Sequence, residues 1–346
     1  MKNPIKAPLI LIIIILNFLF YSCIEDVPES PAGVSNKFIF TDITIDSIYD
    51  SSVSIICGME NFKGIAIKQI GFCYSQLNNP DTSDLYTILD PVYNSLEIKD
   101  SLTNLQPGTI YFARAYIAYY GTIIYSNEIS FFTYYGTISD YDGNNYYTTQ
   151  IGNQIWMAEN LKTSHYADGT AIPMIENNSI WASLNYDDKA YCYYGNSPSN
   201  GVTYGVLYTW AAAMNGKNSS SLNPSDIQGV CPNGWHLPSN AEWTVLINFL
   251  GGPSDAGRKM QEAGIDYWGS ANIHATNASG FTALPGGCRY YYGEFYYIGS
   301  NAFFSSTTEY ESTNIWVCRL GLYGSSVQQN SHPKKGGFSV RCLTDN

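Results

Sequence analysis

An apolar run from Leu9 to Phe20 follows two lysines and ends shortly before Cys23. A positively charged start, a short hydrophobic stretch and a small residue before the break are the marks of a secretory signal. The run is also shorter than the roughly 20 residues that a membrane-spanning helix needs. We therefore expect residues 1–22 to be a signal peptide, so that the rest of the chain folds outside the cytoplasm, where disulfides are permitted.

Cys23 supports a second prediction. The stretch Leu19–Cys23 resembles a lipobox, in which the cysteine thiol is acylated and becomes the first residue of the mature chain. Glu25 and Asp26 resemble the signal that sends Bacteroidetes lipoproteins to the outer face of the outer membrane. The resemblance implies an outer membrane lipoprotein exposed at the cell surface, held to the membrane by its lipid, with residues 23–35 as a linker. Ordinary signal cleavage that leaves a free thiol, or a retained membrane helix, are the alternatives.

Composition limits the class of partner. The 346 residues are 45% hydrophobic and only 13% charged, with a net charge of −12. Such a chain repels phosphate and lacks the basic stripe that nucleic-acid binding needs, so we expect no nucleic-acid partner. Four histidines without an HExxH arrangement and eight cysteines without a CxxC pair match no metal-site pattern, and we expect neither a metal nor a cofactor. The length favours two folded units after the signal.

Residues 36–133 have the pattern of short strands separated by turns. Ser51–Cys57 and Ile110–Ala118 alternate between apolar and polar positions, and Ile70–Tyr74 is typical of a strand. This pattern predicts a β-sandwich.

The turn into one of these strands resembles that of a known family. Leu102–Tyr111 places a tyrosine just inside a strand, as in the tyrosine corner of fibronectin type III domains, and Tyr125–Thr133 resembles their last strand. The resemblance implies a fibronectin type III/Ig-like β-sandwich in which the phenol of Tyr111 bonds to nearby backbone. Such a unit serves as a spacer or as a binding module. Cys57 and Cys73, on neighbouring predicted strands, could bridge the two sheets or stay as two buried thiols.

A turn and a helix can be predicted directly in the second half. Asp142 and Gly143 suit the turn of a β-hairpin, in which Asp142 stabilises the turn, whereas the glycine and glutamate positions of an EF-hand calcium loop are not matched. Ser239, with Glu242 three residues later, is a capping box that begins a helix, and Gly251–Gly252 ends it. One face of this helix is apolar and is expected to pack on a sheet: Trp243, Leu246, Ile247 and Leu250.

An ordered set of motifs over residues 137–346 resembles one family. The motifs are DYDGNNYYTTQIGNQIWMAENLKT, TYGVLYTWAAAM, CPNGWHLPSNAEWTVLINFLGG, GFTALPGGCRY, FFSSTTEY and KKGGFSVRC. Together they look like the Fibrobacter succinogenes major paralogous domain, which occurs in exported Bacteroidetes and Fibrobacteres proteins, often behind fibronectin-like modules on lipoproteins, and has no agreed activity. The segments GWHLPSNAEW and GFSVRC also resemble formylglycine-generating enzymes, which share a C-type-lectin-like fold. The resemblance implies an α+β C-type-lectin-like domain with extensive irregular loops.

The same resemblance bears on the cysteines. Formylglycine-generating enzymes need a pair of reactive thiols whose motif this chain does not match. The arginines beside Cys318 and Cys342 are expected to point to the other face of a strand, so we expect no enzymatic activity. A bridge between Cys231 and Cys342 resembles the long-range bridge of C-type lectin folds. Cys288 and Cys318 depart from the family together on neighbouring strands, which suggests that they bridge each other and leave Cys192 over, although no connectivity follows from sequence alone.

The region from Arg289 to Asn330 is dense in tyrosine, serine and asparagine, which suits a face that recognises glycans or proteins. The calcium-binding sequence sets of sugar-binding lectins are not matched, so calcium-dependent recognition is not expected. Strand alternation places Trp316 and Leu320 in the interior. The candidate ligand-binding residues are Tyr290, Tyr292, Tyr296, Asn301, Tyr310, Tyr323, Gln328 and Asn330.

Three functions remain for the folded chain. The first is a non-catalytic binding or adhesion module for an extracellular glycan or protein. The second is a structural subunit of an envelope or fimbrial assembly, and the third is an enzyme of the formylglycine-generating type. An assembly subunit should offer an open sheet edge or a donor strand, whereas an adhesin should offer a concave aromatic patch.

Overall fold

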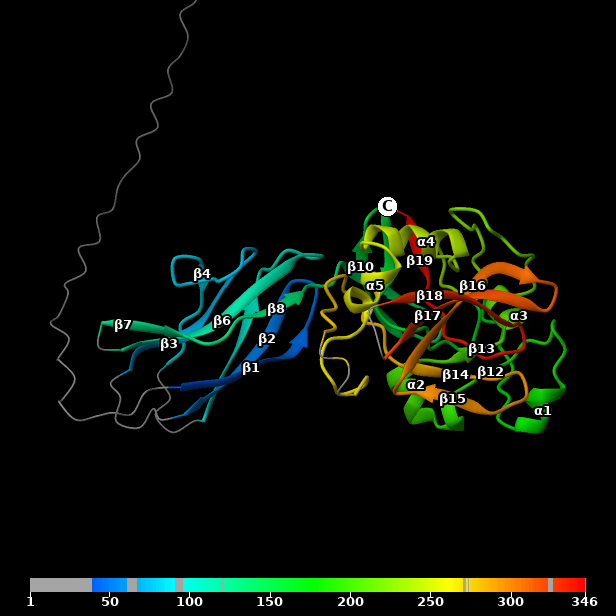
Figure 1. The fold of residues 1–346 in the computed structure, drawn as a ribbon, viewed down its shortest axis with the longest axis horizontal. Coiled ribbons are helices and arrows are strands. Elements are labelled where there is room, and N and C mark those ends of the chain that lie inside the picture. The colour runs from blue at the N-terminus through cyan, green and yellow to red at the C-terminus, as the bar shows by residue number, and fades with distance from the viewer. Residues whose placement is uncertain are drawn as a thin grey trace, which may run out of the picture.

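The computed structural model describes residues 39–60, 67–90, 96–119, 121–269, 272, 274–322 and 326–345. These residues form two units that lie side by side along the long axis of the molecule, both built mainly of β-strands (Figure 1). The expected signal peptide, the linker and Cys23 lie outside the described residues. Within the described part, no helix is both long enough and apolar enough to cross a bilayer.

The first unit packs two sheets face to face. The strands β1 (Ile39–Ile48), β2 (Ser52–Glu60) and β5 (Glu97–Thr103) form one antiparallel sheet in the order β1-β2-β5. The other sheet has the order β4 (Leu85–Tyr86), β3 (Ile67–Ser75), β6 (Ile110–Tyr119) and β7 (Thr122–Tyr125), and β8 (Ile129–Phe132) also pairs with β6. Alternate residues of the facing strands, among them Val53, Ile55, Ile70 and Phe72, fill the core between the sheets. The predicted sandwich arrangement is confirmed.

The tyrosine at the start of β6 makes the contact that its sequence context predicts. The ring of Tyr111 is buried and stacks on Phe131, with centroids 5.8 Å apart. The backbone N–H of Gln106 donates to its phenol oxygen at 3.1 Å. This bond ties the turn that precedes β6 to the strand itself.

Of the two alternatives for Cys57 and Cys73, the bridge is wrong and the pair of free, buried thiols is confirmed. Cys57 shares the inward face of β2 with Val53. Cys73 directly follows the inward-facing Phe72 on β3, so its side chain points to the outer face of that sheet. There its thiol donates to the carbonyl of Pro80 at 3.3 Å. The two sulfurs are therefore separated by the β3 sheet itself.

The second unit contains two main sheets. The strands β9 (Gly136–Ser139), β10 (Asn145–Ile151), β11 (Gln154–Met157) and β19 (Leu343–Asp345) form an antiparallel sheet in the order β19-β11-β10-β9. The larger sheet has the order β15 (Phe295–Ile298), β14 (Gly286–Arg289), β16 (Asn301–Glu311), β17 (Asn314–Gly321) and β18 (Val327–Pro333). In it β14 runs parallel to β16, and the other pairs are antiparallel. A small ladder joins β12 (Tyr191–Cys192) to β13 (Leu207–Tyr208).

Short helices and long loops surround these sheets. The helices are α1 (Asn178–Ser183), α2 (Pro198–Tyr204), α3 (Trp210–Met214), α4 (Asn240–Phe249) and α5 (Pro253–Met260). Helix α4 begins with the predicted capping box, in which the side chains of Ser239 and Glu242 each accept from the other's backbone N–H. Its predicted apolar face is buried, and Gly251 follows its end with a φ of +102°, a conformation that favours glycine. The helix prediction is confirmed.

One long-range bridge is present as predicted. Cys231 and Cys342 form a disulfide that ties the loop before α4 to the residue before β19. Cys192, the cysteine left over in the prediction, is a free, buried thiol.

The other predicted bridge of this unit, between Cys288 and Cys318, is wrong, because both thiols are free. Their strands, β14 and β17, are separated by β16. Cys288 and Phe303 belong to the core on one side of this sheet, whereas Cys318 and Phe304 belong to the core on the other side. Two thiols on opposite faces of a sheet and two strands apart cannot reach each other.

The two units meet at an aromatic stack. The ring of Tyr134 stacks on Tyr147 with centroids 4.2 Å apart, and Tyr49 meets Tyr147 edge-on at 6.4 Å. Two backbone hydrogen bonds accompany the rings. The N–H of Tyr134 donates to the carbonyl of Tyr49, and the N–H of Tyr135 donates to the carbonyl of Thr148. Rings and backbone from both units therefore make up this junction.

Candidate functional site

Five tyrosines gather on the β14–β15 hairpin. We call Tyr290, Tyr291, Tyr292, Tyr296 and Tyr297 the tyrosine patch. The ring of Tyr290 is half-buried and touches three others, with centroids 4.9 Å from Tyr296, 5.4 Å from Tyr292 and 6.4 Å from Tyr297. The other four are 39–46% exposed. The patch thus offers ring faces and phenol hydroxyls together on one surface.

Two phenols of the patch, those of Tyr290 and Tyr292, stay protonated at neutral pH. Burial and then a hydrogen bond with Tyr297 raise the pKa of Tyr290 well above its usual range. A hydrogen bond with Tyr296 raises the pKa of Tyr292 to about 12. Neutral phenols both donate and accept hydrogen bonds, which is what sugar hydroxyls and peptide groups require.

A buried arginine holds the hairpin in place. Arg289 is fully buried and donates from Nε to the carbonyl of Gly293 at 2.9 Å, inside the hairpin turn. Its terminal nitrogens donate to the carbonyls of Ile175 and Glu176 at 2.6 and 2.8 Å and to the side chain of Asn178 at 2.8 Å. The turn is further fixed because Gly293 has a φ of +101° and leaves no room for a Cβ against the backbone of Asn178. The tyrosine patch therefore stands on a rigid support, which lowers the entropic cost of binding.

The sequence did not single out Arg289 for this role. A tyrosine-rich segment that begins with arginine resembles a polar surface, and three of the four hydrogen-bond partners of Arg289 lie more than a hundred residues earlier in the chain. Only the preference of a guanidinium for several oxygen acceptors could have suggested a structural position, without naming those acceptors.

The eight predicted ligand residues do not lie at one site. Tyr290, Tyr292 and Tyr296 come together in the tyrosine patch. Tyr310 is 48% exposed but contacts Trp316, with centroids 4.9 Å apart, rather than the patch. Trp316 is only partly buried, which corrects its predicted place in the interior, whereas Leu320 is buried as predicted.

Three of the remaining candidates lie on β16 and β18, and one is not described. Asn301, on β16, is only 6% exposed and lies in the lining of a pocket. Gln328 is exposed and Asn330 is half-buried, both on β18. Tyr323 lies outside the described residues.

A cavity of about 310 Å³ opens beside the tyrosine patch, and we call it the Arg319 pocket. It lies where β15 and β17 end and β16 and β18 begin, and it brings together Asn301 and Gln328, two residues predicted to bind a ligand. Its described lining is Tyr297, Ser300, Asn301, Arg319, Gly321, Leu322, Ser326 and Gln328. Tyr297 belongs to both the pocket and the patch, so the two form one continuous surface.

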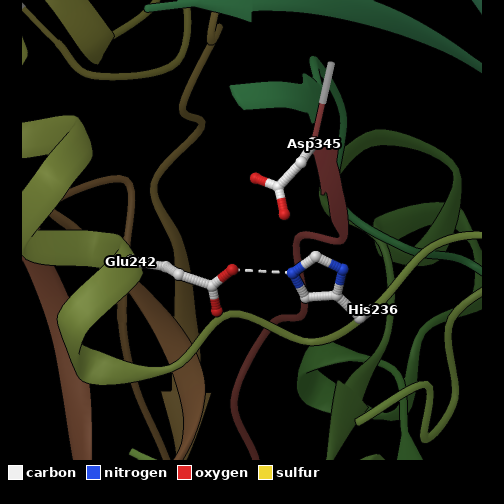
Figure 2. A group of neighbouring side chains, drawn as sticks. All are labelled: His236, Glu242 and Asp345. Atoms are coloured by element: carbon white, nitrogen blue, oxygen red, sulfur yellow. Dashed lines mark hydrogen bonds and ion pairs between the residues drawn. The ribbon is translucent and has the colours of Figure 1, made fainter. Parts of the chain in front are cut away.

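A second group of polar side chains lies at the start of α4 (Figure 2). His236, Glu242 and Asp345 hold ligand-type atoms within 4.8 Å of one another, an arrangement that a metal ion could use. One carboxylate oxygen of Glu242 already accepts from the N–H groups of Ser239 and Ser225, at 2.8 and 3.2 Å. The other oxygen meets Nε2 of His236 at 2.7 Å. Glu242 caps the helix, and a cation there would face the positive end of the helix dipole.

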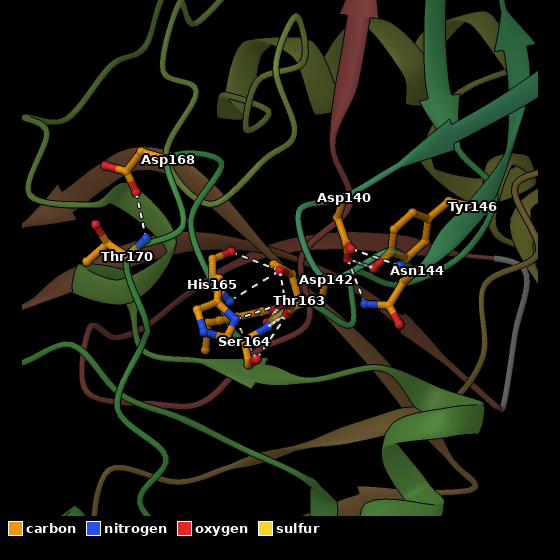
Figure 3. A network of polar contacts seen from close by, with 10 residues as sticks. Asp140, Asp142, Asn144, Tyr146, Thr163, Ser164, His165, Asp168 and Thr170 are labelled. Carbon is orange, nitrogen blue, oxygen red and sulfur yellow. Dashed lines mark hydrogen bonds and ion pairs between the residues drawn. The ribbon is translucent and has the colours of Figure 1, made fainter.

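A third group combines a serine, a histidine and an aspartate (Figure 3). The carboxylate of Asp142 lies 2.5 Å from Nδ1 of His165 and accepts from the backbone and hydroxyl of Ser164 and the hydroxyl of Thr163. The hydroxyl of Ser164 also meets Nδ1 of His165, at 3.1 Å. A catalytic triad needs the serine and the aspartate on different nitrogens of the ring, so these residues do not form one.

This network also corrects the predicted role of Asp142 in its own turn. The hairpin between β9 and β10 is present, with Gly143 at a φ of +81°. The residue that closes the turn is Asp140, whose carboxylate accepts from the backbone and side chain of Asn144 at 3.0 and 2.8 Å (Figure 3). Asp142 instead fastens the turn to residues 163–165. Burial raises the pKa of Asp142, but the hydrogen bonds from Ser164 outweigh this and hold the pKa below its usual range.

Comparison with known proteins adds a family to this geometry. No curated protein matches the chain in sequence. Solved structures that resemble it include a computationally redesigned β-sandwich protein, 21% identical over 27% of this chain and 92% of that chain, with a TM-score of 0.21. The sensor domain of the anti-sigma factor RsgI4 of Pseudobacteroides cellulosolvens is 19% identical over 29% of this chain and 96% of that chain, with a TM-score of 0.22. The chicken CNTN1 FN1–FN3 domains are 16% identical over 27% of this chain and 30% of that chain, also with a TM-score of 0.22.

TM-scores of this size carry no argument about function. The sequence comparison is more informative, because the profile of the Fibrobacter succinogenes major domain matches residues 149–344, which is more than half of the chain and includes the tyrosine patch and the Arg319 pocket. The chain therefore belongs to the Fibrobacter succinogenes major domain family.

Proposed function

We propose that this protein is a non-catalytic recognition module that binds an extracellular glycan on its tyrosine patch. The observation that carries the proposal is the rigid cluster of five tyrosines, four of them 39–46% exposed, on a hairpin fixed from below by Arg289. Exposed aromatic clusters of this kind mark binding surfaces on soluble domains. Stiff rings with hydroxyl groups give contact area at little entropic cost.

A glycan fits this surface better than a protein does. Sugar rings present CH faces that pack on aromatic rings and hydroxyls that bond to phenols. The neighbouring Arg319 pocket, at about 310 Å³, is at the lower end of the range for small-ligand sites, roughly 300–1,000 Å³, and can take a single sugar unit. A protein ligand is the outcome that the experiment below must separate from a glycan.

The proposal places this module at the outside of the cell. In it, Cys23 carries lipid in the outer membrane, the fibronectin type III-like unit acts as a spacer, and the second unit is a C-type-lectin-like domain that faces outward. The support is the signal-like start of the sequence, its lipobox-like stretch and the order of the two units.

Two cysteines considered for oxidative catalysis have other roles. Cys342 is in the disulfide with Cys231, and Cys318 is buried in the core, where burial raises the pKa of its thiol far above the usual range. A reactive thiol has to be exposed and acidified. These positions favour recognition over an enzyme of the formylglycine-generating type. In the larger sheet of the second unit, β15 is a short edge strand and α5 packs against β18 at the other edge, so this sheet lacks the long open edge that an assembly subunit would need.

The test is a glycan-array screen with the full-length protein in detergent, followed by titration of any glycan bound. We expect the Tyr290/Tyr292/Tyr296→Ala variant to lose at least tenfold in affinity, which is about 1.4 kcal/mol. The matched control pair is Tyr292→Ala and Tyr186→Ala, because these tyrosines are 42% and 44% exposed and only Tyr292 is in the patch. Unchanged glycan affinity in the triple variant, or binding of proteins but no glycan by the folded chain, would contradict the proposal.

A further inference from the structure

In the part of the chain that the structure describes, Arg319 is a cation without a counter-charge, although the protein is acidic. The chain has 29 acidic and 17 basic residues, so acidic partners are plentiful. Arg258, for example, pairs with Asp255 at 3.1 Å. Among the described residues no carboxylate lies within ion-pair distance of Arg319, although it is partly buried in the wall of a pocket. A partly buried guanidinium that keeps its charge exposed to a cavity is suited to an anionic ligand.

Two amide side chains orient this guanidinium without neutralising it. In the amide orientation that satisfies its neighbours, the side-chain oxygen of Asn301 accepts from both Nε and Nη2 of Arg319 at 2.9 Å. The side-chain oxygen of Gln328 accepts from Nη1 at 3.3 Å. A guanidinium has five N–H donors, and these three bonds leave one on each terminal nitrogen. That is the pair that a carboxylate engages with its two oxygens.

The pocket also contains a strained aromatic residue. Tyr297 has a φ of +71°, a left-handed conformation that is rare for a bulky side chain. Contacts with Phe303, at 5.7 Å between centroids, and with Tyr290 and Tyr296 hold its ring in place. Strain of this kind is concentrated at ligand-binding positions. Here it places one tyrosine in both the patch and the wall of the Arg319 pocket.

We propose that the Arg319 pocket binds the carboxylate of an acidic sugar of the uronic acid class, with the neighbouring sugars of the same glycan lying on the tyrosine patch. The inference rests on the proposed function and specifies the class of its ligand. Arg319 binds the carboxylate, the hydroxyls and amides of Ser300, Ser326 and Gln328 face the sugar hydroxyls, and Tyr297 packs against the ring. A carboxylate on a peptide is disfavoured, because the same pocket supplies an aromatic face and several hydroxyl partners for a polyhydroxylated ring.

The experiment compares two probes that differ only in the carboxylate, methyl glucuronide and methyl glucoside, each titrated into the full-length protein in detergent. We expect the acid to bind at least tenfold more tightly, since a hydrogen bond to a charged group contributes more than one between neutral groups. Arg319→Gln should abolish this preference, Arg319→Lys should keep only part of it because lysine lacks the planar fork, and the matched Arg258→Gln control should keep all of it.

His332 gives a second readout that does not depend on folding of a variant. Burial and then the charge of Arg319 hold the pKa of His332 below its usual range, and the ring of Phe303 contacts both side chains. A bound carboxylate offsets the charge of Arg319, so the acid probe should raise the pKa of His332 in an NMR titration, and the neutral probe should not.

Three results would overturn the inference: equal affinity for the two probes, an acid preference that survives Arg319→Gln, or an acetylated peptide with a free carboxylate that binds as tightly as the uronide. Its failure is distinguishable from failure of the proposed function. A patch that binds neutral glycans without an acid preference refutes the inference alone. Glycan binding that survives loss of the patch tyrosines refutes the proposed function.

Discussion

Removing the bridge between Cys231 and Cys342 should destabilise the second unit strongly. The two cysteines are 111 residues apart in the sequence. For a loop of that length the chain-entropy model gives about 4.8 kcal/mol of stabilisation, through restriction of the unfolded chain. Both cysteines are fully buried, so the double Cys231→Ala/Cys342→Ala variant also loses two packed sulfur atoms. The part due to the bridge must therefore be separated from the part due to packing.

Cys288→Ala supplies that control. Cys288 lies in the same core cluster as Cys231 and Cys342, is equally buried, and is a free thiol. Its substitution measures the cost of removing one sulfur atom from this core. We expect the double variant to lose about 4–5 kcal/mol more than twice the cost of the single variant.

Urea unfolding followed by tryptophan fluorescence is the appropriate assay. All seven tryptophans lie between Trp156 and Trp316, so their emission reports on the second unit alone. A loss of unfolding free energy in the double variant within about 1 kcal/mol of twice the loss measured for Cys288→Ala would refute the argument. It would mean that the packing of β19 against β11, and not the covalent link, holds the carboxyl end in place.

Three further predictions concern single groups. Unfolding the purified protein without reductant should expose five reactive thiols, because the bridge takes two of the eight cysteines and lipid takes Cys23; a count of six would rule out the lipid. In thermal unfolding, the Tyr297→Gly variant should be more stable than the Tyr297→Ala variant by about 1–2 kcal/mol. Both variants lose the ring, but only alanine keeps a Cβ in the left-handed conformation. Equal stability would show that the φ of +71° has no energetic cost. Arg319→Gln should raise the pKa of His332 towards 6.5, since burial and then Arg319 now lower it. The folded pKa lies below the unfolded one, so the stability linked to this histidine is lost as the pH falls below 6.5, and the loss should be smaller in the variant; an unchanged NMR titration curve would contradict this.

Local signals in the sequence predicted the elements that depend on nearby residues. Helix α4 follows from the capping box and the spacing of four apolar residues, and the structure places both as expected. The corner role of Tyr111 was predicted from a resemblance to fibronectin type III domains, and its partner, the backbone N–H of Gln106, is five residues away. The bridge between Cys231 and Cys342 was predicted from a family resemblance, which reports on distant contacts that local patterns do not contain.

The wrong pairings share a physical cause. Cys288 and Cys318 were placed on adjacent strands, but β16 inserts between them and the two thiols face different cores. A shift of one residue along a strand reverses the face of a side chain, and the sequence does not state strand order. Asp142 was assigned to its own turn because aspartate commonly stabilises such turns. In the structure its carboxylate oxygens form hydrogen bonds with residues 163–165, which only folding brings near.

The candidate site was the least predictable part. The density of tyrosine did indicate the β14–β15 region, because aromatic residues can be counted in the sequence. Two arginines, one that supports the hairpin and one in the wall of the pocket, were not identified, because the role of an arginine depends on its hydrogen-bond acceptors. Arg289 bonds to backbone carbonyls of a distant loop, and Arg319 is held by amides from two other strands. These partners are set by tertiary packing and not by spacing along the chain.

The aromatic stack at the junction of the two units has a mechanical consequence. Tyr134 and Tyr147 stack at 4.2 Å, and backbone bonds to Tyr49 and Thr148 run beside them. Twisting one unit against the other would have to separate these rings and break those bonds together. A pulling force on the second unit is thus transmitted to the first across this junction. The orientation of the second unit relative to the first is therefore set by contacts within the protein itself.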